Sequence, residues 1–147
     1  MRRIVPLARW SAGPAFFFSI VGCTGLTAGP EVAVVAPVAA SRDSAWVRAK
    51  RALTAEVFTV DVQDSLGGHL TAMRYPSATA KVGTAAACRV QLDLKLEGSS
   101  TSAALAGQSR WIAPEVSQDA NAKVCEQERQ ETVDRILAVV SPPPTTP

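Results

Sequence analysis

The chain has 147 residues, with 15 Lys and Arg against 13 Asp and Glu and a single histidine. This length suits one small domain with tails. Three of the arginines (Arg2, Arg3 and Arg9) lie in the first ten residues, so the rest of the chain is close to neutral. It therefore offers no electrostatic basis for nucleic-acid binding. With one histidine and no CxxC motif, the sequence also offers few side chains that could bind a metal ion.

The first 22 residues have the order of a secretory signal. The arginines precede an apolar run of about a dozen residues around Phe16–Phe18, and small residues lead into Cys23. A membrane-spanning helix would need roughly 20 residues. The motif Ile20-Val21-Gly22-Cys23 resembles the lipobox of bacterial lipoproteins, which implies cleavage before Cys23 and lipid on its thiol. Two alternatives stay open: an ordinary cleaved signal with Cys23 by chance, or an uncleaved anchor.

The lipoprotein resemblance also implies where the protein is located. Cleavage would leave 125 of the 147 residues, with 12 basic and 13 acidic side chains. In Gram-negative lipoproteins an Asp after the cysteine resembles an inner-membrane retention signal, and this chain has Thr24 there. The resemblance therefore implies a lipid-anchored protein of the cell envelope. In a Gram-negative host it would lie at the outer membrane and face the periplasm.

Residues 23–40 are low in complexity and are predicted to be the lipidated cysteine followed by a flexible tether. The valines between Pro30 and Pro37 could instead form a short strand. At the other end of the chain, the proline-rich residues 141–147 are predicted to be a disordered, extended tail.

Residues 41–140 are predicted to form the folded domain. Helical spacing of apolar residues indicates helices over about 43–55 and 118–140. Alternation indicates strands over 57–63, 69–75, 88–96 and 101–112. This order predicts an α+β fold in which two helices pack on one face of an antiparallel sheet of about four strands. The expected core includes Trp46, Leu53, Phe58, Val60, Leu92, Leu94, Ile136 and Leu137.

Residues 43–75 resemble a known repeat. They contain Trp46 followed by Ala52-Leu53, the strand Phe58-Thr59-Val60, then Asp64, Gly68 and Arg74-Tyr75. This pattern resembles the helix-grip repeat of the BamC (NlpB) lipoprotein family of the outer-membrane barrel-assembly machinery. The resemblance implies a helix-grip fold and a role in outer-membrane assembly or maintenance. The chain departs from the family in having one such unit instead of two, and Val57 where the family tends to carry Gly.

Cys88 and Cys125 are predicted to face the same interior, one near a strand start and the other near a helix start. In an oxidising periplasm they can form a disulfide. Closing this loop would contribute roughly 3–4 kcal/mol in the chain-entropy model. The alternative, that they are two small buried hydrophobic residues that never pair, stays open.

The residue types that are candidates for chemistry do not form a recognisable catalytic set. His69 follows a glycine turn without a Ser or Cys nucleophile motif around it, so it is interpreted as structural or solvated. Asp61 and Asp64 are three apart on a strand and point to opposite faces. Tyr75 and Trp111 could anchor a partner, or they could cap the edge of the core.

These observations together predict a non-enzymatic lipoprotein with no cofactor. It would be held to the membrane through Cys23 and could bind another protein of the envelope. The alternatives are a ligand-binding or enzyme-inhibitor module of the periplasm and, in third place, an envelope hydrolase. An apolar cavity under the strand that begins at Cys88 would favour the ligand-binding alternative.

Overall fold

The computed structural model describes residues 26–143, except 82 and 115–117. The predicted signal, Cys23 and the end of the predicted tail (144–147) lie outside the described residues. In chain order the elements are β1 (Leu26–Ala28), β2 (Val32–Val38), α1 (Arg42–Ala55), β3 (Thr59–Asp64), β4 (His69–Arg74), the short 3-10 helix η1 (Ala85–Ala87), β5 (Arg89–Gly98), β6 (Ala103–Pro114) and α2 (Gln118–Val140).

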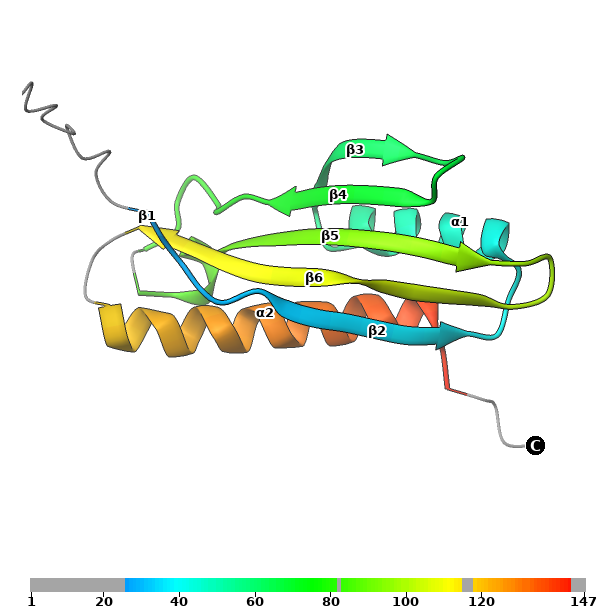
Figure 1. Ribbon diagram of the computed structural model, residues 1–147. Helices are drawn as coiled ribbons and strands as arrows, with labels where there is room; N and C mark the ends of the chain where they lie inside the picture. Colours follow the sequence, from blue (N-terminus) through cyan, green and yellow to red (C-terminus); the bar gives the residue numbers. More distant parts are fainter. Residues whose placement is uncertain (1–25, 82, 115–117, 144–147) are drawn as a thin grey trace, which may run out of the picture.

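The strands form one antiparallel sheet with the order β1-β6-β5-β4-β3. β2 also pairs with β6: β2 lies along residues 103–109 of that strand and β1 along residues 112–114. Both helices contribute buried residues to the same core as the inward side chains of the sheet, so they cover one face of it (Figure 1). The predicted α+β fold with two helices on an antiparallel sheet is therefore confirmed. The predicted number of about four strands is wrong, because the sheet has six.

The two additional strands lie in the segment predicted as a flexible tether. β2 alternates buried and exposed residues, and Val34, Ala36 and Val38 enter the main core. A run of valine and alanine is simple in composition, but this alternation gives it an apolar face that completes the sheet beside β6. The alternative of a short strand is confirmed, and the strand continues through Pro37, which a position at the edge of a sheet permits.

A bulge separates β1 from β2. Gly29 donates its N–H to the carbonyl of Trp111 at 2.9 Å, whereas Val32 already pairs with Ser109. The two residues between them, Pro30-Glu31, therefore stand opposite a single residue of β6, which is the definition of a β-bulge. The bulge shifts the register by one residue where the N-terminal segment passes the groove described below.

Helix α1 has clear signals at both ends. The side chain of Ser41 caps its start by accepting from the N–H of Ser44 at 3.2 Å. At its end Phe58 donates to the carbonyl of Leu53 and Val57 to that of Thr54, the paired hydrogen bonds of a Schellman motif. Val57 occupies the left-handed position of that motif, with φ of 59°, where glycine is usual.

The main core lies between the sheet and the helices. All eight predicted core residues belong to it, although Trp46, Val60 and Leu137 are only partly buried. Leu92, Leu94 and Leu96 of β5 are each about 1 % exposed. The alternation in β5 that predicted one buried face is thus confirmed, and its charged residues lie on the opposite, open face of the sheet.

Gly107 explains how the small-residue stretch of β6 serves as a central strand. It pairs with Leu94 of β5 and with Val34 of β2. A Cβ atom at this position would lie 2.0 Å from the carbonyl oxygen of Asp93. With any other residue at position 107, β6 could not approach β5 this closely. The register along β5 and β6 is continuous, so the small residues produce close contact and no bulge there.

Candidate functional site: a groove beside Trp111

A groove of about 600 Å³ opens between the N-terminal half of α2 and the bulge that joins β1 to β2. Its surface is mainly apolar, and its volume falls in the range typical of ligand sites. The lining residues are Pro30, Trp111, Ala122, Lys123, Glu126, Gln127, Gln130 and Glu131. The groove is largely open to solvent.

Trp111 supplies the aromatic wall of the groove. It is only 6 % exposed and packs with Cys88, Ala113 and Cys125 in a cluster separate from the main core. Gly29 lies against its indole, because a Cβ atom there would fall 2.1 Å from the indole nitrogen. The structure therefore gives Trp111 the core-edge position that was one of its two predicted roles, and Trp111 also lines the groove.

A disulfide joins Cys88, which precedes β5, to Cys125 in α2. Their Cα atoms are 5.4 Å apart, and the bond closes a separation of 37 residues. The predicted pairing is therefore confirmed, and the alternative of two unpaired buried residues is wrong. The bond ties the N-terminal half of α2, which lines the groove, to the start of β5 next to Trp111.

A buried arginine lies behind the groove. Arg129 is 2 % exposed, and it donates to the hydroxyl of Ser109 at 2.8 Å and to the carboxylate of Glu126 at 2.5 Å. Ser109 in turn donates to the carbonyl of Val32 at 3.4 Å. The hydrogen bond from Arg129 lowers the pKa of Glu126, against a smaller opposing effect of burial. Helix α2, β6 and β2 are thus joined by one polar chain.

Sequence reasoning missed Arg129. A charged residue is seldom buried without a partner, so it was not expected inside. The signal that could have found it is its spacing, because it lies four residues after Cys125 and three before Thr132, both of which face inward. Glu126, three residues earlier on the helix, is the partner that makes the buried position possible.

A second group of charges connects the two helices to β4. Arg74 contacts Glu128 at 2.5 Å and Glu56 at 3.8 Å, and Arg135 contacts Glu56 at 2.9 Å. The hydrogen bond to Glu56 raises the pKa of Arg135. Arg74 also lies over the ring of Phe58, 5.9 Å from its centroid. These contacts fix the end of α1 against α2 and leave the groove free.

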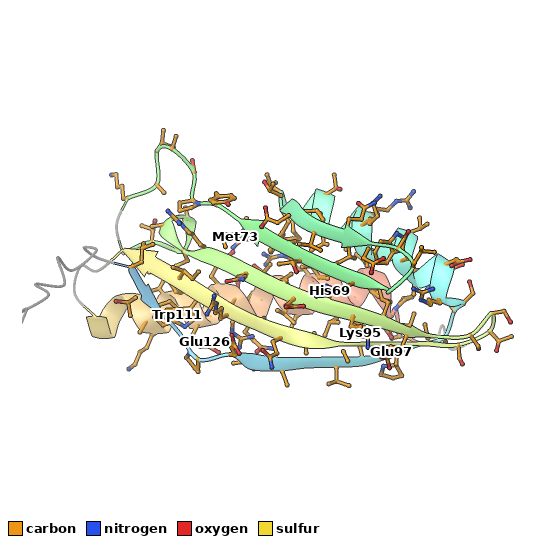
Figure 2. All side chains as sticks on the ribbon, turned by 45° about the horizontal axis from the view of Figure 1, so that its top comes forward. His69, Met73, Lys95, Glu97, Trp111 and Glu126 are labelled. Carbon is orange, nitrogen blue, oxygen red and sulfur yellow. A yellow bond between two sulfur atoms is a disulfide. The ribbon has the colours of Figure 1, made fainter. Side chains whose placement is uncertain are left out.

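The open face of the sheet carries the remaining charged candidates (Figure 2). His69 lies 2.6 Å from Asp93, and both side chains are substantially exposed. Lys95 pairs with Glu97 at 2.6 Å, and this pairing lowers the pKa of Glu97. The shallow depression on this face, about 60 Å³ in volume, is a tenth of the groove's size. The ring of His69 and the carboxylate of Asp93 therefore form a hydrogen-bonded pair on a solvated surface.

The acidic residues near the β3–β4 turn have separate positions. Asp64 accepts hydrogen bonds from the N–H groups of Leu66 and Gly67 at 3.0 and 2.9 Å, so it caps the turn. Asp61 stands at a register shift of β3 and is exposed. Tyr75 is 52 % exposed, and the guanidinium of Arg89 lies 5.7 Å from its ring centroid. Tyr75 therefore offers a different surface from the wall formed by Trp111.

The space under β5 is filled. The cavity there measures about 10 Å³ and is lined by side chains of the main core. Such a volume holds at most about one water molecule. Among the residues described, no group of three or more His, Cys, Asp or Glu side chains is placed to hold a metal ion. The described helices include none that is both long and apolar enough to cross a membrane.

Comparisons with known proteins give distant structural likenesses only. No family model matches the chain, and no curated protein matches it. The crystal structure of Ara h 8.0201 is similar with a TM-score of 0.48 and 8 % identity, over 78 % of this chain and 98 % of that one. TTHA0849 from Thermus thermophilus gives a TM-score of 0.32 at 12 % identity, over 74 % of this chain and 98 % of that one. An uncharacterised protein from Rhizobium leguminosarum gives a TM-score of 0.32 at 12 % identity, over 78 % of this chain and 97 % of that one.

Proposed function

We propose that this chain is a non-enzymatic lipoprotein of the cell envelope, anchored by lipid on Cys23, whose domain binds another envelope component. The observation that carries the binding role is the groove beside Trp111, which is large, mainly apolar and braced by a disulfide. The motif Ile20-Val21-Gly22-Cys23 supports the anchoring role. In a Gram-negative host the domain would lie at the outer membrane and face the periplasm, because Thr24 follows the cysteine.

The groove suits a polypeptide segment with apolar side chains and polar flanks. Its floor is apolar, whereas its rim carries the carboxylates of Glu126 and Glu131, the ammonium group of Lys123 and two amides. Glu126 is already bound to Arg129, and Glu131 accepts from Gln127 at 2.8 Å. A buried aromatic wall with a polar rim is the usual arrangement of a protein interface.

The size of the internal cavity argues against the form of the ligand-binding alternative that expected an apolar cavity under β5. A small lipid or glycan held under the sheet would need a volume of several hundred cubic ångströms. The cavity under β5 measures about 10 Å³ and the surface groove about 600 Å³. Binding at the surface groove therefore requires no opening of the main core.

The arrangement of the elements also supports the finer resemblance. A 23-residue α2 lies across an antiparallel sheet and meets α1 on the same face, as a helix-grip domain requires. We therefore propose a helix-grip-like fold and, from the resemblance of residues 43–75, a role in outer-membrane assembly or maintenance. The partner would then be a component of that process.

Anchoring is tested with the substitution Cys23→Ala. This variant should lose palmitate labelling and accumulate as a precursor of unchanged length, because the lipidated thiol is a requirement for cleavage in lipoproteins. Conversion of Ser19 to Ala, within the same leader, serves as the matched control and should label normally. Labelling that persists in Cys23→Ala would contradict the anchoring role.

Binding is tested by crosslinking in cells, with a photoreactive amino acid at Gln127 in the groove or at Ala138 on the exposed surface of the same helix. The Gln127 position should give reproducible protein adducts that mass spectrometry can identify, and Ala138 should not. Enrichment of barrel-assembly components would support the proposed role. Adducts from Ala138 alone, or equal adducts from both positions, would contradict the groove as the binding site.

A substitution pair separates occupancy of the groove from general damage. Ala122→Trp should fill the groove and abolish the Gln127 adducts, whereas Ala138→Trp should leave them unchanged. Circular dichroism and the intact Cys88–Cys125 bond serve as controls for folding. Adducts that survive in a folded Ala122→Trp variant would show that the partner contacts another surface.

A further inference from the structure

The position of β1 places the proposed lipid anchor at one end of the sheet. Leu26 begins β1 and pairs with Pro114, the last residue of β6. Cys23 precedes Leu26 by three residues, and three residues of extended chain span at most about 11 Å. A tether running to residue 40 would have allowed the domain to turn freely. With β1 in the sheet, the anchor can lie only next to this end.

Several elements meet at this end, which we call the anchor end and define by the described residues Leu26, Tyr75, Lys81 and Arg89. β4 ends here, and β5 and α2 begin here (Figure 1). The opposite end carries the β3–β4 turn and the β5–β6 hairpin. Ten residues of β5 separate the two ends, about 30 Å at the usual rise per residue.

The side chains of the anchor end suit a lipid headgroup region. Leu26 is 58 % exposed and Tyr75 is 52 % exposed. Arg89 lies over the Tyr75 ring, and Lys81 is exposed in the loop after β4. Aromatic rings are enriched at membrane interfaces, and cations there are attracted by anionic lipids.

The far end, at the β3–β4 turn and the β5–β6 hairpin, carries charges of both signs. Its described acidic side chains include Asp43 at the start of α1, Asp64 at the β3–β4 turn and Glu97 at the β5–β6 hairpin, and all three are exposed. Acidic groups gain nothing from contact with an anionic or zwitterionic surface. Arg42 and Lys95 lie at this end too, and Lys95 pairs with Glu97. The orientation therefore depends on the length of the chain before β1 and on the side chains of the anchor end, and not on a contrast in net charge.

We propose that the lipidated protein rests its anchor end on the bilayer surface, with the strands directed away from it. This orientation depends on the proposed lipidation of Cys23. Tyr75, Lys81 and Arg89 then contact lipid headgroups. The groove lies along α2 between Ala122 and Glu131, about 6–20 Å from the start of that helix at 1.5 Å per residue. A partner in the groove is therefore held close to the membrane.

The test uses the full, lipidated protein in vesicles of phosphatidylethanolamine and phosphatidylglycerol that contain headgroup spin-labelled lipid. A fluorescent amino acid is introduced at Thr79, which is exposed at the anchor end, or at Ser100, which is exposed in the far hairpin. We expect loss of fluorescence at Thr79 and no loss at Ser100. Mass spectrometry of the N-terminal peptide establishes whether Cys23 carries lipid.

The outcomes separate the orientation from the anchoring on which it depends. Lipid on Cys23 together with equal quenching at both positions, quenching at Ser100 alone, or no quenching at either would overturn the orientation and leave the anchoring intact. An N-terminal peptide without lipid would overturn the anchoring and the orientation together. Lipid on Cys23 with quenching at Thr79 alone would establish both.

Discussion

The two apolar clusters of this domain are stabilised by different means. The main core fills the space between the sheet and both helices with leucine, valine and alanine side chains. The cluster beside the groove contains Cys88, Trp111, Ala113 and Cys125, and a disulfide crosses it. A small cluster buries too little apolar area to define its own geometry. The groove end therefore depends on one covalent bond and on the buried Arg129, whereas the main core depends mainly on packing.

Removal of the disulfide should have the largest effect. Cys88→Ala with Cys125→Ala should lower the free energy of unfolding by about 3–4 kcal/mol, because the bond closes a 37-residue separation. Urea unfolding of the oxidised and reduced wild type should show the same difference. The double variant should not respond to reductant. An unchanged unfolding midpoint on reduction would mean that packing, and not the bond, stabilises the groove end.

Truncation of a core leucine tests the other cluster. Leu92 is 1 % exposed, so Leu92→Ala should lower the free energy of unfolding by about 3 kcal/mol through lost burial and a residual cavity. Val35→Ala is the control, because Val35 is 72 % exposed and its truncation should change stability by less than about 0.5 kcal/mol. Urea unfolding measures both. The Leu92 effect should persist under reducing conditions, and its disappearance there would show that the two clusters are not independent.

The ion pair behind the groove gives a pH dependence. The pKa of Glu126 is lowered, so its stabilising contribution is present above its ordinary value of 4.5 and is lost as the pH falls through the lower, folded value. Glu126→Gln should therefore cost about 1 kcal/mol at neutral pH, a value discounted because the carboxylate is partly exposed. The difference from wild type should vanish under acid conditions.

Unfolding free energies measured from about pH 6 to pH 3 would check this loss. Glu97→Gln is the matched control, because its pKa is lowered too, by Lys95, but the pair lies in full solvent. It should change stability little at any pH. A constant difference between wild type and Glu126→Gln across this range would show that the carboxylate contributes through shape and not through charge.

The elements with a strong period were predictable from the sequence. The alternation in β5 and the helical stripe of α2 gave correct faces for Cys88 and Cys125, and thereby the disulfide. β2 was predicted only as an alternative to a tether, and β1 was not predicted, because a valine–alanine run between prolines also has the composition of a tether. Their pairing with β6 is a long-range contact, and only the buried side of Val34 and Val38 reveals it.

The candidate site was predictable in part. Trp111 was identified as a candidate from its residue type. The groove beside it depends on the bulge between β1 and β2. A bulge is defined by the pairing register of two strands, and this register cannot be read from the sequence. Arg129 was missed because its burial depends on Ser109 and Glu126, which lie on two different elements. The apolar pattern of a single element predicts which of its faces is buried. It does not predict which polar side chain is buried on that face.

The smallest predicted effect concerns the end of α1, which belongs to the main core. Val57 is 78 % exposed and has φ of 59°, a conformation that costs an L-residue about 1–2 kcal/mol. Val57→Gly removes this cost and adds about 0.5–1 kcal/mol of backbone entropy to the unfolded chain, so a net gain of about 0.5–1 kcal/mol is expected. Val57→Ala keeps a Cβ atom and should gain less. The gain in stability should be equal in oxidised and reduced protein, because Val57 is distant in the chain from the disulfide. A gain confined to the oxidised form would mean that the disulfide also affects the main core.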